Sequence, residues 1–211
     1  MVADHQTSER VYAALKADLL AGIWSFERLN INTMAERYDA SATPVREALL
    51  RLVGEGLLEM PISGGFAIPR LDAGRLRDLY TFSLALGVLI TKHLPSRPPL
   101  CVGDLGQSRL KYPIDALVAV LAENTGNSAI IAATRSLNDS MHPIRRMEEM
   151  RLPGLEKEYS GFLEIIHQYN PARMRKILAN HHRRRLSNVH KILGMAPKSQ
   201  NIQNPAEFKI K

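Results

Sequence analysis

The spacing of apolar residues near the amino terminus predicts a helix. Val11, Leu15, Leu19 and Ile23 follow one another at intervals of four residues, so they form one stripe of an amphipathic helix. Ser8 stands just before this stripe, where a hydroxyl side chain can cap the first free backbone N–H groups of a helix. We therefore expect the first helix to begin at residue 9.

Two shorter helices and a hairpin are predicted next. One helix covers residues 31–38, and the other begins at Thr43-Pro44, a capping residue followed by a proline at the first helical position. Val45, Leu49, Leu52 and Val53 give this third helix an apolar face. Two short extended runs then flank Gly64-Gly65, as in a β-hairpin. This order of elements predicts a winged helix-turn-helix.

After residue 70 only helical periodicity remains, interrupted by a Pro- and Gly-rich stretch at residues 94–113. Helices are expected from residue 76 onward and again at residues 114–123, 128–150, 156–168 and 171–193. The predicted fold is therefore mostly α. A winged helix-turn-helix domain with a small β-hairpin wing covers residues 9–70, an all-α helical effector and dimerisation bundle covers residues 76–194, and a flexible tail covers residues 195–211.

The charge distribution qualifies a nucleic-acid interpretation. The net charge is +7, but residues 1–75 hold 8 basic and 10 acidic residues, so the excess lies in the carboxy-terminal part. An argument for DNA binding must therefore rest on local geometry. The cluster His181-His182-Arg183-Arg184-Arg185 is expected to be a solvated helix face rather than a second nucleic-acid site.

Composition excludes several other classes. The chain has 45% hydrophobic and 23% charged residues, which is ordinary for a globular protein. Its longest apolar stretches are shorter than the roughly 20 residues of a membrane span. The amino terminus shows no secretory leader, and Cys101 is the single cysteine, so we expect a cytoplasmic protein without a disulfide. No constellation of catalytic residues is present, and no enzymatic activity is expected.

The third predicted helix carries the chemistry that suits DNA. The amino-terminal end of a helix favours phosphate, and short hydroxyl side chains with one arginine can reach base edges and backbone oxygens. The glycines at the hairpin tip let the backbone approach a phosphate closely.

These residues resemble the DNA-binding domain of GntR-type bacterial regulators. The resemblance covers residues 11–71 and rests on four signatures: Met34-Ala35-Glu36, the run Ser41-Ala42-Thr43-Pro44-Val45-Arg46-Glu47-Ala48-Leu49, Glu55-Gly56-Leu57-Leu58, and Gly64-Gly65-Phe66. It implies DNA contacts at the start of the third helix and at the wing tip, for which the candidate residues are Ser41, Thr43, Pro44, Arg46, Arg51, Ser63 and Gly64.

The chain departs from the family pattern at two positions. Ala42 and Ser63 stand where the family usually or often has arginine. Each lost phosphate contact weakens affinity and flattens its salt dependence. We therefore expect modest affinity or an operator unlike the common family half-site.

The helical remainder is similar to the effector domain of the FadR-like (FCD) branch, in a shortened form. That branch often binds a divalent metal through one Asp and three His. Here Asp115 is one residue out of register, Tyr159 stands at one His position, and only His181 matches. No cofactor or metal site of the family type is therefore expected. Arg135, Tyr159 and His181 are candidates for holding an effector, although surface ion pairing of Arg135 and a core position for His181 are open alternatives.

The sequence thus predicts a transcriptional regulator, a repressor that binds double-stranded operator DNA as a homodimer and responds to a small effector, for which a carboxylate is one candidate. The alternative is a ligand-binding or protein-interaction module whose DNA binding has weakened.

Overall fold

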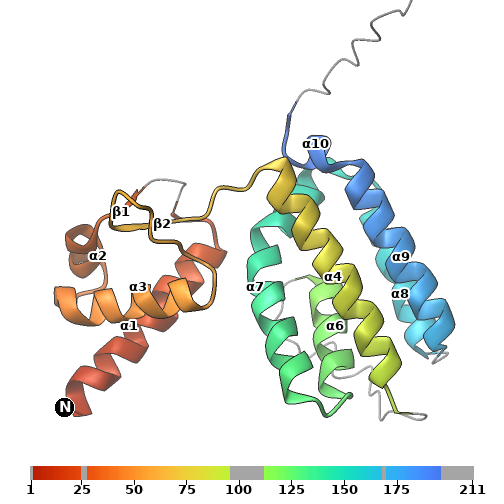
Figure 1. The fold of residues 1–211 in the computed structure, drawn as a ribbon, viewed down its shortest axis with the longest axis horizontal. Helices are drawn as coiled ribbons and strands as arrows, with labels where there is room; N and C mark the ends of the chain where they lie inside the picture. Colours follow the sequence, from red (N-terminus) through yellow and green to blue (C-terminus); the bar gives the residue numbers. More distant parts are fainter. Residues whose placement is uncertain (1, 25–27, 96–111, 168–169, 196–211) are drawn as a thin grey trace, which may run out of the picture.

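The computed structural model describes residues 2–24, 28–95, 112–167 and 170–195, and within these ranges the fold is mostly helical. The amino-terminal lobe contains α1 (Val2–Leu20), β1 (Arg28–Leu29), α2 (Ile31–Arg37), α3 (Ala42–Gly54) and β2 (Phe66–Ala67). The carboxy-terminal lobe contains α4 (Ala73–His93), α6 (Pro113–Glu123), α7 (Ser128–Arg151), α8 (Leu155–His167), α9 (Pro171–Ser187) and α10 (Val189–Ile192). Figure 1 shows the two lobes side by side, joined by an extended linker between β2 and α4.

The first lobe is a small three-helix core with a short sheet. α1 and α2 pack against α3, and the apolar stripe predicted from Val11 and Leu15 is buried at their junction. The expected start of α1 is wrong, because the helix begins at Val2. Ser8 lies inside it and donates a hydrogen bond to Glu47 instead of capping the helix.

The wing is a hairpin reinforced by a third segment. Glu59 and Ala67 exchange backbone hydrogen bonds of 2.8 and 2.9 Å across the turn. The other edge of β2 pairs antiparallel with β1, with Arg28 opposite Ala67 and Leu29 opposite Phe66. The hairpin agrees with the prediction from the sequence. β1 was not predicted, because a strand of two residues has no measurable periodicity.

The second lobe is a bundle in which α4 packs along α9, α6 packs along α7, and α8 packs against α9. α7 remains one helix through Pro143. The last predicted helix is divided at Asn188 into α9 and α10. Most of the predicted interruption, residues 96–111, and residues 196–211 of the predicted tail lie outside the described residues. None of the described helices combines the length and the apolarity needed to cross a membrane.

Two polar contacts connect the lobes directly. Lys16 of α1 forms an ion pair of 2.6 Å with Asp139 of α7, and Arg146 donates from Nη1 to the carbonyl oxygen of Ala21 at 3.3 Å. α7 therefore faces both the bundle and the end of α1.

Candidate nucleic-acid interface

The helix α3 has a buried face and a solvent face. Its buried side chains hold it against α1 and α2 and are Pro44, Val45, Ala48, Leu49 and Leu52. Ser41, Thr43 and Arg46 are exposed at the beginning of the helix. Ser41 takes the extended backbone conformation of an N-cap, but its side chain makes no capping hydrogen bond. The start of α3 therefore presents two hydroxyls and one guanidinium to solvent.

Arg46 has no ion-pair or hydrogen-bond partner among the described residues, in contrast to Arg51. The guanidinium of Arg51 lies 3.7 Å from the ring centroid of Tyr12 and pairs with Glu9 at 2.7 Å. Arg51 therefore joins α3 to α1. Pro44, another of the predicted DNA-contact residues, is buried. The prediction that Thr43 caps α3 and Pro44 is its first residue is wrong, because Ser41 is the N-cap and the helix begins at Ala42.

The tip of the wing is built on two glycines in the left-handed region. Gly64 and Gly65 have φ values of 79° and 82°, and the N–H of Gly64 donates to the carbonyl of Pro61 at 2.8 Å. A side chain at either glycine would be strained by the backbone conformation. Ile62 and Ser63, which precede the glycines, are exposed. The tip can therefore approach another molecule with its backbone.

Arg28 supplies a positive charge at this tip. It lies in β1, opposite Ala67, and its Nη2 donates to the hydroxyl of Ser63. Arg28 thus places a guanidinium at the tip, where Ser63 alone predicts the loss of a cationic contact. One sequence signal could have pointed to Arg28. It lies two residues before Asn30, the N-cap of α2, so it belongs to the segment that leads into that helix.

The carboxy-terminal lobe contains a buried cluster of ion pairs, formed by Asp115, Arg145, Glu148, Glu158, Arg184 and Arg185. Arg145 binds Asp115 at 3.0 Å and Glu148 at 2.9 Å, and Arg185 binds Glu148 at 2.9 Å and Glu158 at 2.7 Å. Three carboxylates thus face three guanidiniums. Burial by itself would raise the pKa of Glu148, but the charges of Arg145 and Arg185 outweigh it and hold that pKa below its ordinary value.

The expected solvated face at residues 181–185 is wrong. His181, His182 and Arg185 are buried, because α9 turns them toward α4, α7 and α8. Of the three arginines in this cluster, Arg183 is exposed, Arg184 is partly buried and Arg185 is buried. The local sequence reads as polar, whereas the partners that make burial favourable lie 27 and 37 residues away at Glu158 and Glu148.

The three predicted effector residues lie in different surroundings. The side chain of Arg135 is 71% exposed and pairs with Glu123 at 2.7 Å. His181 is buried, and its Nδ1 lies 2.6 Å from a carboxylate oxygen of Glu158. Tyr159 is partly buried, and its pKa is raised by burial and by the nearby charge of Glu148. His181 and Tyr159 therefore adjoin the ion-pair cluster, and Arg135 lies on the surface of α7.

The residues around His181 do not fit a metal of the family type. Asp115 is bound by Arg145, and the Nδ1 of His181 is engaged with Glu158, which leaves its Nε2. Within the described residues, no group of three or more His, Cys, Asp or Glu side chains is arranged to hold a metal ion. Guanidiniums already compensate the carboxylates that a cation would need.

Comparison with known proteins agrees with this geometry. Residues 7–68 match the family described as bacterial regulatory proteins, gntR family. The HTH-type transcriptional regulator BphR of Paraburkholderia xenovorans is 33% identical over 79 residues, which span 37% of this chain and 32% of that protein. The match thus covers about a third of the length of that relative.

Two solved structures share the fold of most of the chain. A transcriptional regulator GntR from Rhodococcus sp. RHA1 has a TM-score of 0.72 at 15% identity, over 90% of this chain and 98% of that one. McbR/YncC of E. coli has a TM-score of 0.62 at 20% identity, over 87% of this chain and 97% of that one. The match to the gntR family of bacterial regulatory proteins thus covers the amino-terminal lobe, and the two solved structures share the fold of most of the chain.

Proposed function

We propose that the protein is a sequence-specific DNA-binding transcriptional regulator that acts as a homodimer on an inverted-repeat operator. The observation that carries this proposal is the free, exposed Arg46 beside Ser41 and Thr43 at the beginning of α3. The partial positive charge of a helix amino terminus favours phosphate, and an arginine there can read a guanine edge in the major groove.

The wing extends the same surface. Arg28 and the backbone of Gly64 and Gly65 would contact phosphates flanking the groove that α3 enters. Arg28 compensates in part for the arginines that the family often has at positions 42 and 63. We therefore expect the protein to retain sequence-specific DNA binding, with an ordinary dependence of affinity on salt.

The regulatory part of the proposal is a repressor that releases DNA when a small effector binds. The ion-pair cluster, in which three carboxylates face three guanidiniums, supports an effector domain that folds without a metal. That Arg135, Tyr159 and His181 hold the effector stays a prediction, as does the absence of a metal.

The experiment that tests this function is selection of bound sequences from random duplex DNA with the purified full chain at physiological salt. We expect one inverted repeat, whose half-site spacing reports the separation of the two α3 helices in the dimer. Arg46→Ala should enrich it with a relaxed preference at one base position in each half-site, whereas Arg183→Ala, which changes an exposed arginine of the other lobe, should enrich it with its preference unchanged. If the unaltered protein and the Arg183→Ala variant both bound DNA without sequence preference, the result would instead favour an interaction module with weakened DNA binding.

A further inference from the structure

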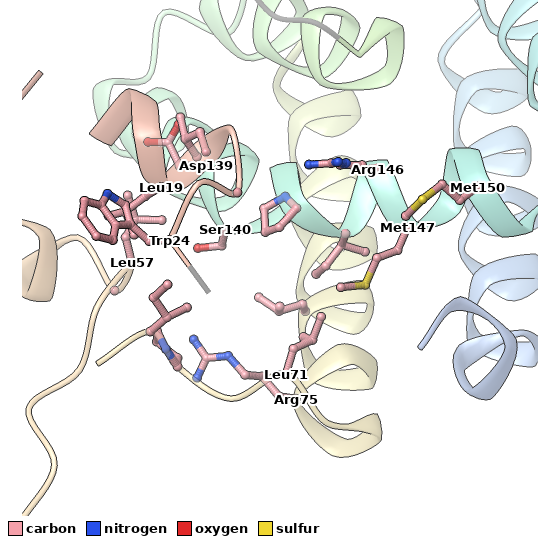
Figure 2. Close-up of a pocket in the computed structure, with 18 residues that line it drawn as sticks. Leu19, Trp24, Leu57, Leu71, Arg75, Asp139, Ser140, Arg146, Met147 and Met150 are labelled. Atoms are coloured by element: carbon pink, nitrogen blue, oxygen red, sulfur yellow. The ribbon is translucent and has the colours of Figure 1, made fainter. Parts of the chain in front are cut away.

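A cavity of about 360 Å³ lies between the two lobes, and both lobes supply its walls. From the amino-terminal lobe come Leu19, Trp24 and Leu57, and from the bundle come Leu79, Pro143 and Met147. In Figure 2, Arg146, Met147 and Met150 of α7 lie on one side of this space, and Leu19 and Trp24 lie on the other. A volume of this size is within the range of small-molecule sites.

The linker itself forms part of the lining. Ile68, Pro69 and Leu71 connect β2 to α4 and contribute to the cavity wall. A molecule bound here would therefore touch the segment that sets the orientation of the winged helix relative to the bundle.

Two guanidiniums give the otherwise apolar cavity a positive character. Arg75 of α4 and Arg146 of α7 both line it, and the side chain of Arg75 has no partner among the described residues. Arg146 makes one hydrogen bond of 3.3 Å, to the carbonyl of Ala21. Asp139 is the acidic residue of the lining, and its charge is compensated by Lys16 at 2.6 Å. The charges that line the cavity therefore favour an anionic ligand.

We propose that this interdomain cavity binds a small amphipathic anion, with an aromatic or aliphatic body against the apolar walls and an acidic group at Arg75, whose guanidinium is free among the described residues. Because the walls belong to both lobes and to the linker, occupancy favours one relative orientation of the lobes and changes operator affinity. The change in operator affinity rests on the proposed function, whereas binding of the anion does not.

The chain carries its own reporter of this site. Trp24 is its single tryptophan, it lines the cavity, and its indole N–H is anchored to the hydroxyl of Tyr38 at 3.1 Å. Energy transfer from Trp24 to a bound fluorescent probe therefore reports occupancy of this cavity and discriminates against distant apolar patches.

The test uses two probes with the same aromatic body, the anion 1-anilinonaphthalene-8-sulfonate and the uncharged N-phenyl-1-naphthylamine. We expect saturable energy transfer from Trp24 to the anion, with about tenfold weaker binding of the uncharged probe, the difference made by a hydrogen bond to a charged group. Arg75→Gln should weaken binding of the anion about tenfold and leave binding of the uncharged probe unchanged. Arg77→Gln, on the same helix as Arg75 but outside the lining, is the matched control.

A filling variant tests the location. Ser140→Phe places a ring into the lining, and the half-buried serine gives up only a hydrogen bond to the carbonyl of Ser136. Both probes should lose energy transfer in this variant, with its helical circular dichroism unchanged. Equal binding of the two probes, or equal effects of Arg75→Gln and Arg77→Gln, would overturn the site.

The coupling is tested separately with the selected operator. Saturating anilinonaphthalene sulfonate should change the operator Kd of the unaltered protein and not that of Ser140→Phe. A protein that binds the probe at Trp24 but enriches no DNA sequence would overturn the proposed function and leave the site standing. Enrichment of an operator without energy transfer from Trp24 would overturn the cavity site and leave the proposed function standing.

Discussion

Acid should destabilise the fold through His182, whose surroundings accommodate only the neutral ring. The side chain is 2% exposed, its Nδ1–H donates to the carbonyl of Leu178 at 2.7 Å, and its Nε2 accepts from the hydroxyl of Ser83 at 2.9 Å. Burial lowers the pKa of His182 to about 4, and the charges of Arg145 and Arg185 act in the same direction against the backbone hydrogen bond.

The size of the effect follows from the two pKa values. In the unfolded chain His182 titrates at its ordinary value of 6.5, so between pH 6.5 and 4 the unfolded state binds a proton that the folded state does not. The stabilisation is complete above pH 6.5 and is lost as the pH falls toward 4. From pH 7 to pH 5 the loss in free energy of unfolding is about 2 kcal/mol for this one group. His181, whose pKa is lowered by burial and by Arg185, adds to it in the same direction.

The assay is urea unfolding at pH 7 and pH 5, followed by helical circular dichroism. His182→Gln should reduce the pH-dependent loss by about 2 kcal/mol, whatever it does to stability at pH 7. His93→Gln, which changes an exposed histidine of α4, should leave the loss as it is in the unaltered protein. If His182→Gln and the unaltered protein lost the same amount between the two pH values, the argument from burial would be refuted.

Three further outcomes are expected. Arg46→Ala should weaken operator binding by about 1–3 kcal/mol and relax the preference at one base position in each half-site, as measured by repeating the selection; an unchanged preference would exclude base reading. Arg28→Gln should lower the slope of log Kd against log salt by about 0.9 per protomer, because one phosphate contact is lost; a slope equal to that of the unaltered protein would remove Arg28 from the interface. Glu148→Leu should cost about 3–5 kcal/mol of unfolding free energy in urea titration, because two buried guanidiniums lose their shared carboxylate; a cost under about 1 kcal/mol would show that water reaches the cluster.

The parts of the fold that the sequence predicts are those set by neighbouring residues. The spacing from Val11 to Leu19 identifies α1, and Gly64-Gly65 locates the wing turn. Thr43-Pro44 locates the start of α3 only to within two residues, because the N-cap is Ser41 and the helix begins at Ala42. Each of these signals lies within one helix or one hairpin. The start of α1 was placed too late, because capping by Ser8 competes with its hydrogen bond to Glu47, 39 residues away.

The features that the sequence did not predict depend on distant partners. His182 and Arg185 appear polar in a local window, and only the fold brings Ser83 and Glu148 to them. Arg28 acquires its place at the wing through a strand of two residues, and the interdomain cavity exists only where the end of α1 meets α7. Pairings of this kind leave no periodicity.

The buried ion-pair cluster also bears on how the bundle is assembled during synthesis. Tyr80 precedes its partner Glu148 by 68 residues, and the other partner of Glu148, Arg185, is synthesised 37 residues later. Until α9 has left the ribosome, the guanidinium of Arg145 faces two carboxylates, Asp115 and Glu148, so the cluster cannot be buried at balanced charge. A nascent chain that stops before Arg185 therefore presents an unfinished bundle behind a complete winged helix. Premature termination is expected to release a winged-helix lobe without a folded bundle.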